Sequence, residues 1–90
     1  MITAEDKKAI IEKYRMHPTD TASTEVQIAL TTLYITNLSK HLQQFKKDHK
    51  TKRRLLKLVG QRKSLLRYLH RYDLTRFHNI VASLKIRASF

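Results

Sequence analysis

The sequence predicts an all-α fold of four helices, in which helices two to four form an antiparallel bundle and a short N-terminal helix protrudes or is mobile. Three observations support this prediction. The 90 residues include one Gly and one Pro, so signals for the turns between strands are scarce. Hydrophobic residues make up 41% of the chain, which is ordinary for a folded protein. They recur at helical spacing, and the length suits one domain over residues 1–90.

The first helix is expected over residues 3–14. Thr3 can act as its N-cap, and two acids in the first turn favour the positive end of the helix dipole. The apolar stripe of this segment is narrow, so the helix must either dock on a neighbour or swing freely. His17 precedes Pro18, and the residue before a proline avoids helical geometry, so the helix should end here.

The second helix is expected from about residue 24 to residue 44. Either Ser23 or Thr24 can be its N-cap, and with Thr24 as the cap Gln27 completes a capping-box pattern. The segment carries two apolar faces, which predicts a central helix packed on two sides. One face holds Val26, Leu30 and Leu33, and the other holds Ile28, Ile35 and Leu42.

A short connection, residues 45–49, predicts that the third helix returns antiparallel to the second. Asp48 can cap the third helix, expected over residues 50–72, and Asp73 can cap the fourth. The apolar side of the third helix consists of Leu55, Leu58, Val59, Leu65, Leu66 and Leu69. The apolar stripe of the fourth consists of Phe77, Ile80, Val81 and Leu84.

Positive charge is concentrated in the third helix and the residues before it. The net charge is +12, and residues 46–72 hold eleven of the nineteen Lys and Arg with a single acid, Asp48. A charged helix face is commonly just solvated, but this density on one side favours a polyanionic partner. The cations opposite the apolar side are Lys52, Arg53, Lys57, Lys63, Arg67 and Arg71.

Several classes of protein are disfavoured by the composition. No apolar run reaches transmembrane length, and the acidic start is unlike a signal peptide, so no membrane partner is expected. The chain has no Cys, and no two of its five His stand four residues apart as in a helical zinc site. A glycine-rich phosphate loop and a nucleophile with a nearby base are also lacking. The sequence therefore predicts neither an enzyme nor a protein with a metal or cofactor.

Three polar residues should gather at the closed end of the helical hairpin: His41, Asp48 and Thr51. Asp48 has two readings, which the residues alone leave open. It can cap the helix and balance local charge, or it can accept a hydrogen bond from a guanine amino group in an RNA minor groove. In the second reading His41 and Thr51 add sugar or base-edge contacts, and nearby cations such as Lys47 hold phosphates.

Other residues also have two readings. Tyr68, at the margin of the basic side, is either a core-edge residue or a platform for an exposed base or ribose. The hydroxyls of Thr21 and Thr24 serve as turn and cap groups, or they also contact phosphates and sugars. Gly60 costs the helix on the order of 1 kcal/mol relative to Ala, and its place on the basic side would let a backbone come close.

The stretches DTASTEVQIALTT, KKDH and HKTKRRLLKLVGQRKSLLRYL resemble the bacterial-type ribosomal protein S15 family of the small subunit. The resemblance covers about residues 10–84. It implies a structural protein of the cytoplasmic ribosome that binds small-subunit rRNA at a three-way junction and at the minor groove of an adjacent helix. It also implies early binding in the assembly of the central domain, neighbouring small-subunit proteins, a bridge to large-subunit rRNA, and in some members binding to their own mRNA. Outside the ribosome, a monomer is expected.

The resemblance also assigns residues to the two rRNA sites. The junction contacts would be Thr21, Thr24, Gln27, Tyr68 and Arg71, and the minor-groove contacts would be His41, Asp48 and Thr51. Phosphate contacts are expected from Lys47, Lys52, Arg53, Lys57 and Lys63. The sequence departs from the usual family pattern at Ala22, which replaces a glycine, at Ser64, which replaces a basic residue, and at Arg54 and Arg67.

Two other functions fit the sequence less well than rRNA binding. A DNA-binding helical module would carry base-reading side chains at the N-terminal end of a recognition helix, whereas these cations run along a whole helix side. A cationic protein of membrane surfaces would need a free apolar face, whereas these apolar stripes are needed for a core. The sequence therefore favours an RNA-binding structural protein.

Overall fold

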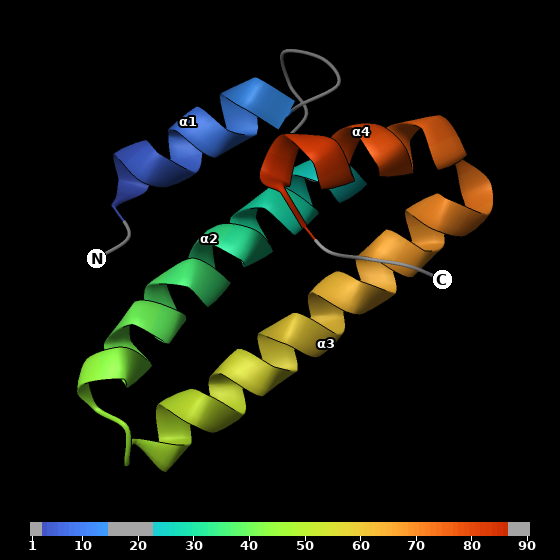
Figure 1. The fold of residues 1–90 in the computed structure, drawn as a ribbon. Coiled ribbons are helices and arrows are strands. Elements are labelled where there is room, and N and C mark those ends of the chain that lie inside the picture. The colour runs from blue at the N-terminus through green and yellow to red at the C-terminus, as the bar shows by residue number, and fades with distance from the viewer. Residues whose placement is uncertain (1–2, 15–22, 87–90) are drawn as a thin grey trace.

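The computed structural model describes residues 3–14 and 23–86, and all the regular secondary structure in these two ranges is helical. Four helices follow one another along the chain: α1 (Ala4–Tyr14), α2 (Thr24–Gln44), α3 (His49–Tyr72) and α4 (Leu74–Leu84) (Figure 1). The all-α prediction is confirmed, and the helix boundaries lie within about one residue of the expected ones. The predicted stop at His17 and Pro18 lies outside the described residues.

The start of α1 is held by a reciprocal pair of hydrogen bonds. The backbone N–H of Asp6 donates to Oγ1 of Thr3 at 3.1 Å, and the backbone N–H of Thr3 donates to Oδ2 of Asp6 at 3.0 Å. This arrangement satisfies two of the N–H groups that a helix start leaves unpaired. The bond that the Thr3 backbone donates to the Asp6 carboxyl, followed by the contact with the Thr3 side chain, lowers the pKa of this carboxyl.

The other three helices also begin at side-chain caps. Ser23 is the N-cap of α2, since its Oγ accepts from the Val26 N–H at 3.3 Å. Of the two predicted caps Ser23 is therefore correct, and Thr24 is already the first helical residue. Asp48 caps α3 and Asp73 caps α4, as predicted, because each carboxylate accepts from a backbone N–H three residues further on.

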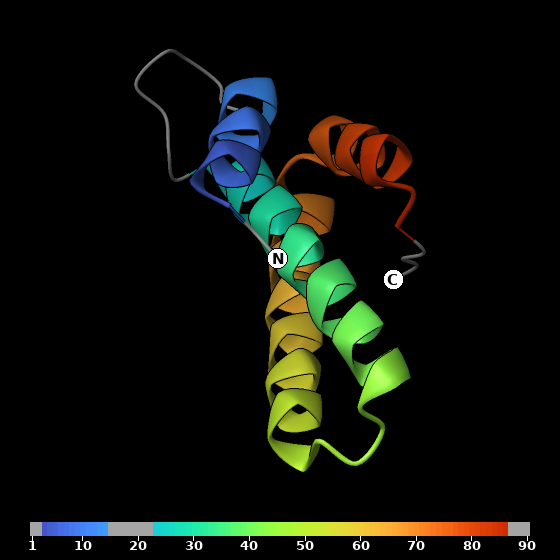
Figure 2. The ribbon, with the colours of Figure 1, turned by 90° about the vertical axis from the view of Figure 1, so that its left-hand side faces the viewer.

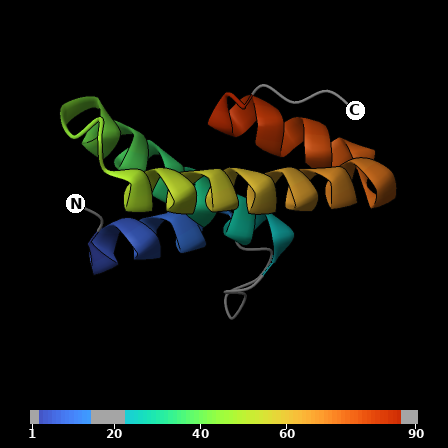
Figure 3. The same cartoon turned by 90° about the horizontal axis from the view of Figure 1, so that it is seen from below.

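The core lies where α2, α3 and α4 meet. α2 and α3 form the expected antiparallel hairpin, and α4 folds back over the C-terminal half of α3 (Figures 1 and 3). The central apolar cluster draws its buried side chains from all three helices, so helices two to four form one bundle. These side chains are Ile28, Leu66, Leu69, Phe77 and Ile80. Val26 and Ala29 of α2 are also buried.

The first helix is docked and does not protrude. Figure 2 shows α1 and α4 on opposite sides of the upper part of the hairpin, and α1 packs along α2. The Tyr14 hydroxyl lies 2.6 Å from Oγ of Ser83 on α4, and the Tyr14 ring packs against the core. The ammonium group of Lys7 lies 5.4 Å from the ring centroid of Tyr34 on α2. Side chains of α1 thus contact both α2 and α4.

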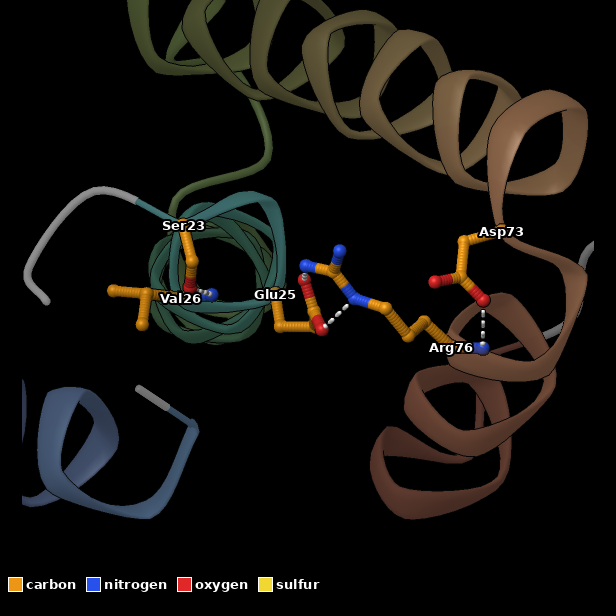
Figure 4. Close-up of polar contacts among 5 residues, drawn as sticks. All are labelled: Ser23, Glu25, Val26, Asp73 and Arg76. Atoms are coloured by element: carbon orange, nitrogen blue, oxygen red, sulfur yellow. Dashed lines mark hydrogen bonds and ion pairs between the residues drawn. The ribbon is translucent and has the colours of Figure 1, made fainter. Parts of the chain in front are cut away.

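An ion pair joins the starts of α2 and α4. Glu25 is the one charged residue that is buried within the described ranges, at 8% exposure. Its carboxylate accepts two hydrogen bonds from the Arg76 guanidinium, one of them from Nε at 2.5 Å (Figure 4). These bonds raise the pKa of Arg76 above its ordinary value. The fork geometry fixes both the distance and the orientation of the two helix ends.

Val59 and Arg62 depart from the simple division of α3 into an apolar side and a basic side. Val59 is 38% exposed although it was placed on the apolar side, because α4 covers only the C-terminal part of α3. Arg62 projects among the leucines, and its Nη1 donates to Oγ1 of Thr32 on α2 at 3.3 Å. Burial lowers the pKa of this guanidinium. Arg62 thus forms a polar link between α2 and α3.

Candidate nucleic-acid interface

The closed end of the hairpin brings together the three polar residues singled out by sequence. Oδ1 of Asp48 accepts the capping bond from the Thr51 backbone at 3.1 Å. Oδ2 of the same carboxylate accepts from the Thr51 hydroxyl at 2.7 Å and lies 2.8 Å from Nε2 of His41. Asp48 therefore links the last turn of α2 to the first turn of α3.

The hydrogen bonds around Asp48 determine which lone pairs at the closed end of the hairpin remain available as acceptors. The two Thr51 bonds, followed by the one to His41, lower the pKa of Asp48 to about 2, so it is ionised near neutral pH. An ionised carboxylate can only accept, so the 2.8 Å contact with Nε2 of His41 is a hydrogen bond that the imidazole donates. The Thr51 hydroxyl likewise donates its hydrogen bond to Asp48, and its oxygen lone pairs remain available as acceptors. His41, Asp48 and Thr51, which we name the tip group, thus offer hydrogen-bond acceptors amid many cations.

The pKa of Asp48 also makes the stability that this carboxylate contributes dependent on pH. Because the folded-state pKa lies below the ordinary value of 3.8, the carboxylate contributes its full stabilisation above that value. The contribution is lost as the pH falls towards about 2. Near neutral pH the tip network is therefore fully formed.

The connection before α3 adds an aromatic and cationic surface to the tip. The ring centroids of His41 and Phe45 lie 4.7 Å apart, and Phe45 is 56% exposed. A shallow groove here is lined by His41, Gln44, Phe45, Lys46, Lys47 and Asp48. Lys47 thus lines the same groove as Asp48 and His41.

The basic side of α3 forms a continuous exposed surface. Its six cations are all exposed and lie opposite the helix side that enters the core. We name this surface the basic ridge, and its members are Lys52, Arg53, Lys57, Lys63, Arg67 and Arg71.

A second group, the expected junction contacts, lies at the other end of the bundle. Tyr68 is 54% exposed, and its ring centroid lies 4.9 Å from that of Tyr72. The Arg71 guanidinium stacks over the Tyr72 ring at 5.5 Å. Thr24 and Gln27 occupy the first turn of α2. Thr21 lies outside the described residues.

A shallow groove between α2 and α3 lies next to this second group. Its lining residues are Gln27, Leu30, Thr31, Gln61, Ser64 and Leu65. Gln27 thus sits at the edge of a hollow that faces the solvent.

The two groups are held apart by one helix. Thr51 and Arg71 are twenty residues apart on α3, which at 1.5 Å per residue corresponds to about 30 Å. The structure therefore does not bring the predicted site residues to one place. It sets them at two ends of a straight element, with the basic ridge between them.

Two exposed aromatic residues were missed by sequence reasoning. Phe45 packs on His41, and Tyr72 pairs with Tyr68 while being 65% exposed. The signal for Tyr72 was present, since four residues separate it from Tyr68 and such pairs meet on a helix. The signal for Phe45 was weak, because contacts made by a connecting residue depend on how the hairpin closes.

Within residues 3–14 and 23–86, no cluster of three His, Asp or Glu side chains is placed to hold a metal ion. Over the same ranges, none of the helices combines the length and apolar character needed to cross a bilayer.

Comparison with known proteins identifies the family. The sequence profile described as "Ribosomal protein S15" matches residues 7–87, nearly the whole chain. The chain belongs to the ribosomal protein S15 family. As an S15 member it is a structural ribosomal protein and not an enzyme.

Individual S15 relatives agree over almost their full length. A protein named "Small ribosomal subunit protein uS15" from Thermoanaerobacter sp. (strain X514) is 52% identical over 87 residues, which cover 97% of this chain and 99% of that protein. The proteins of the same name from Oceanobacillus iheyensis and Staphylococcus carnosus are each 50% identical over 86 residues. Those matches cover 96% of this chain and 97% of each relative. The S15 resemblance inferred from the sequence motifs is confirmed.

Proposed function

We propose that this chain binds small-subunit rRNA directly, as a single-domain monomer, and helps to nucleate assembly of the central domain of the small subunit. The observation that carries the proposal is the placement of two polar groups about 30 Å apart on α3, joined by the basic ridge. A helix that carries a recognition group at each end fits a structured RNA better than a flexible single strand. We assign the tip group to an RNA minor groove and the Tyr68–Arg71 group to a three-way junction.

The chemistry of the tip supports a minor-groove contact. In the minor groove, guanine presents its amino group as a donor, and the wide, shallow groove of RNA also presents ribose hydroxyls. The tip offers matching acceptors in the Thr51 hydroxyl oxygen and the remaining lone pair on Oδ1 of Asp48, with Nδ1 of His41 as a third whenever the imidazole is neutral. An acid beside a phosphate backbone would otherwise repel RNA, so its presence here favours base reading.

The Tyr68–Arg71 group supports a contact with irregular RNA. Exposed aromatic rings and an arginine stacked on one of them suit unpaired bases or riboses, which occur at junctions. Thr24 and Gln27 would add hydroxyl and amide contacts from the start of α2. The family resemblance extends the proposal to neighbouring small-subunit proteins and to a bridge with large-subunit rRNA.

Chemical footprinting provides the direct test of the proposal. The full chain is bound to small-subunit rRNA, and we expect protection at two separate places, a three-way junction and a neighbouring helix. Protection of one continuous duplex, or equal affinity for duplex DNA, would contradict the assignment.

The contribution of the basic ridge is measurable from the salt dependence of binding. We expect affinity to fall steeply with salt, because cations on the protein displace counterions from RNA. Replacing Lys57, Lys63 or Arg71 by Ala should each flatten the slope of log K against log salt by up to about one unit. Lys8→Ala, an exposed cation on α1, is the control and should leave the slope unchanged. Unchanged slopes in all three ridge variants would mean that the ridge faces solvent.

The base-reading role of Asp48 predicts a specific coupling with guanine. Asp48→Ala should weaken RNA binding by about 1–3 kcal/mol, the value of one specific base contact. On RNA in which the contacted guanine is replaced by inosine, which lacks the amino group, the same change should cost less. A double-mutant cycle of protein and RNA measures this difference.

The same change removes a helix cap, so a matched control is needed. Asp73→Ala removes the equivalent cap from α4, far from the tip. Any loss of RNA affinity in this variant should be the same on guanine RNA and on inosine RNA. If the Asp48→Ala and inosine effects simply add, Asp48 acts only as a cap and the base-reading assignment is wrong.

A further inference from the structure

Gly60 has no role that the folded chain itself explains. It is the only glycine, and it lies in the middle of α3 with ordinary helical backbone angles. A Cβ added at this position would meet no atom within 4 Å, so neither turn geometry nor internal packing requires glycine. Glycine in a helix interior nevertheless costs stability relative to alanine. The reason for its presence should therefore lie outside the chain.

The surface around Gly60 differs from the rest of the exposed side of α3. Leu56 is 62% exposed and Val59 is 38% exposed, and both lie within one turn of Gly60. Ser64 is uncharged, and its hydroxyl donates a hydrogen bond to the Gly60 carbonyl of the same helix at 3.2 Å. We name these four residues, Leu56, Val59, Gly60 and Ser64, the neutral patch.

Cations surround the neutral patch on its own helix. Arg53 and Arg67 stand seven residues before and after Gly60, which places them on the same helix side about 10 Å away in either direction. Lys57 and Lys63 flank the patch at closer range, and all four cations are exposed. A polyanion that follows the ridge therefore meets cations on both sides of the neutral patch.

We propose that the sugar–phosphate backbone of bound RNA seats on the neutral patch, with a ribose in contact with the Cα of Gly60. The flanking phosphates then lie over the four cations, and the apolar faces of the ribose meet Leu56 and Val59. The proposal rests on the rRNA-binding function proposed above and adds a third contact between its two ends. Charge complementarity selects RNA over a protein partner, because a protein would bury four like charges around an apolar contact.

The test uses graded substitutions at position 60 in the full chain. Gly60→Ala should raise the Tm by about 4 °C through helix propensity and yet weaken binding to an rRNA fragment that spans the central-domain junction. Gly60→Leu should weaken binding by about tenfold or more, since it holds the backbone further away. Gly60→Lys is the decisive variant, because it adds a cation. We expect it to bind more weakly than the unchanged chain, which separates steric from electrostatic effects.

Asn79→Ala on α4 is the matched control for helix stabilisation. It adds helix propensity at an exposed position on another helix and should leave RNA affinity unchanged. Unchanged or stronger binding by both Gly60→Leu and Gly60→Lys would overturn the proposal. Normal RNA binding by these two variants, combined with their failure to be incorporated into the small subunit, would also overturn the proposal. That result would indicate that a protein contacts the patch. Failure of the unchanged chain to bind the fragment would instead refute the proposed function itself.

Discussion

Replacing Leu69 by Ala should lower the free energy of unfolding by about 3–5 kcal/mol. Leu69 is 1% exposed and belongs to the cluster at which α2, α3 and α4 meet. Its loss removes buried apolar surface and leaves a cavity within this cluster, which also contains Phe77 and Ile80. The total stability of small proteins is about 5–15 kcal/mol, so this change should consume a large part of it.

Urea or thermal unfolding of the two proteins, followed by circular dichroism, measures the loss. For a chain of this size each kcal/mol corresponds to about 4–8 °C in Tm. Leu56→Ala is the matched control, because the same side chain is removed from a position that is 62% exposed. We expect a cost below about 1 kcal/mol for the control. Equal losses in the two variants would show that the cluster is not the core of the bundle.

The second large effect is expected from Arg76→Met, which removes one half of the ion pair with Glu25. The Glu25 side chain is 11% exposed, so this change leaves a carboxylate largely shielded from water and without its guanidinium. Removing one partner of a buried pair is more costly than the pair is worth, because the remaining charge keeps its desolvation penalty. We expect a loss of about 2–4 kcal/mol.

A second variant separates this explanation from simple loss of packing. Replacing both residues, with Glu25→Leu added to Arg76→Met, removes the stranded charge and should recover much of the stability. Arg53→Met, on the exposed ridge, serves as the control and should cost little. If the double variant is as unstable as the sum of its single changes, the two side chains are not coupled.

Sequence reasoning succeeded where the controlling interaction is local. Asp48 and Asp73 were predicted as caps because a cap depends on a backbone N–H only three residues away. The stripe that buries Phe77 and Ile80 follows from helical periodicity alone. The grouping of His41 with Asp48 followed from the short connection, since a hairpin brings its two ends together.

Long-range contacts could not be predicted in the same way. Glu25 and Arg76 are 51 residues apart, and nothing in their neighbourhoods marks them as partners. The same applies to the docking of α1, which depends on Tyr14 reaching Ser83 across the bundle. Val59 was misplaced because periodicity shows which side of a helix is apolar, whereas the reach of α4 decides how much of that side is covered.

The distribution of burial gives the bundle one stiff end and one compliant end. No residue from 30 to 65 is fully buried, and the core draws only on residues 25–29 of α2, 66–69 of α3 and 77–80 of α4. The closed end of the hairpin is therefore packed by fewer neighbours than the opposite end, which lies between α4 and α1 (Figure 2). Small changes in the crossing of α2 and α3 at that opposite end become larger displacements of Asp48 and His41 at the tip. The chain can thus hold one recognition group rigidly while the other adjusts to the spacing of its target.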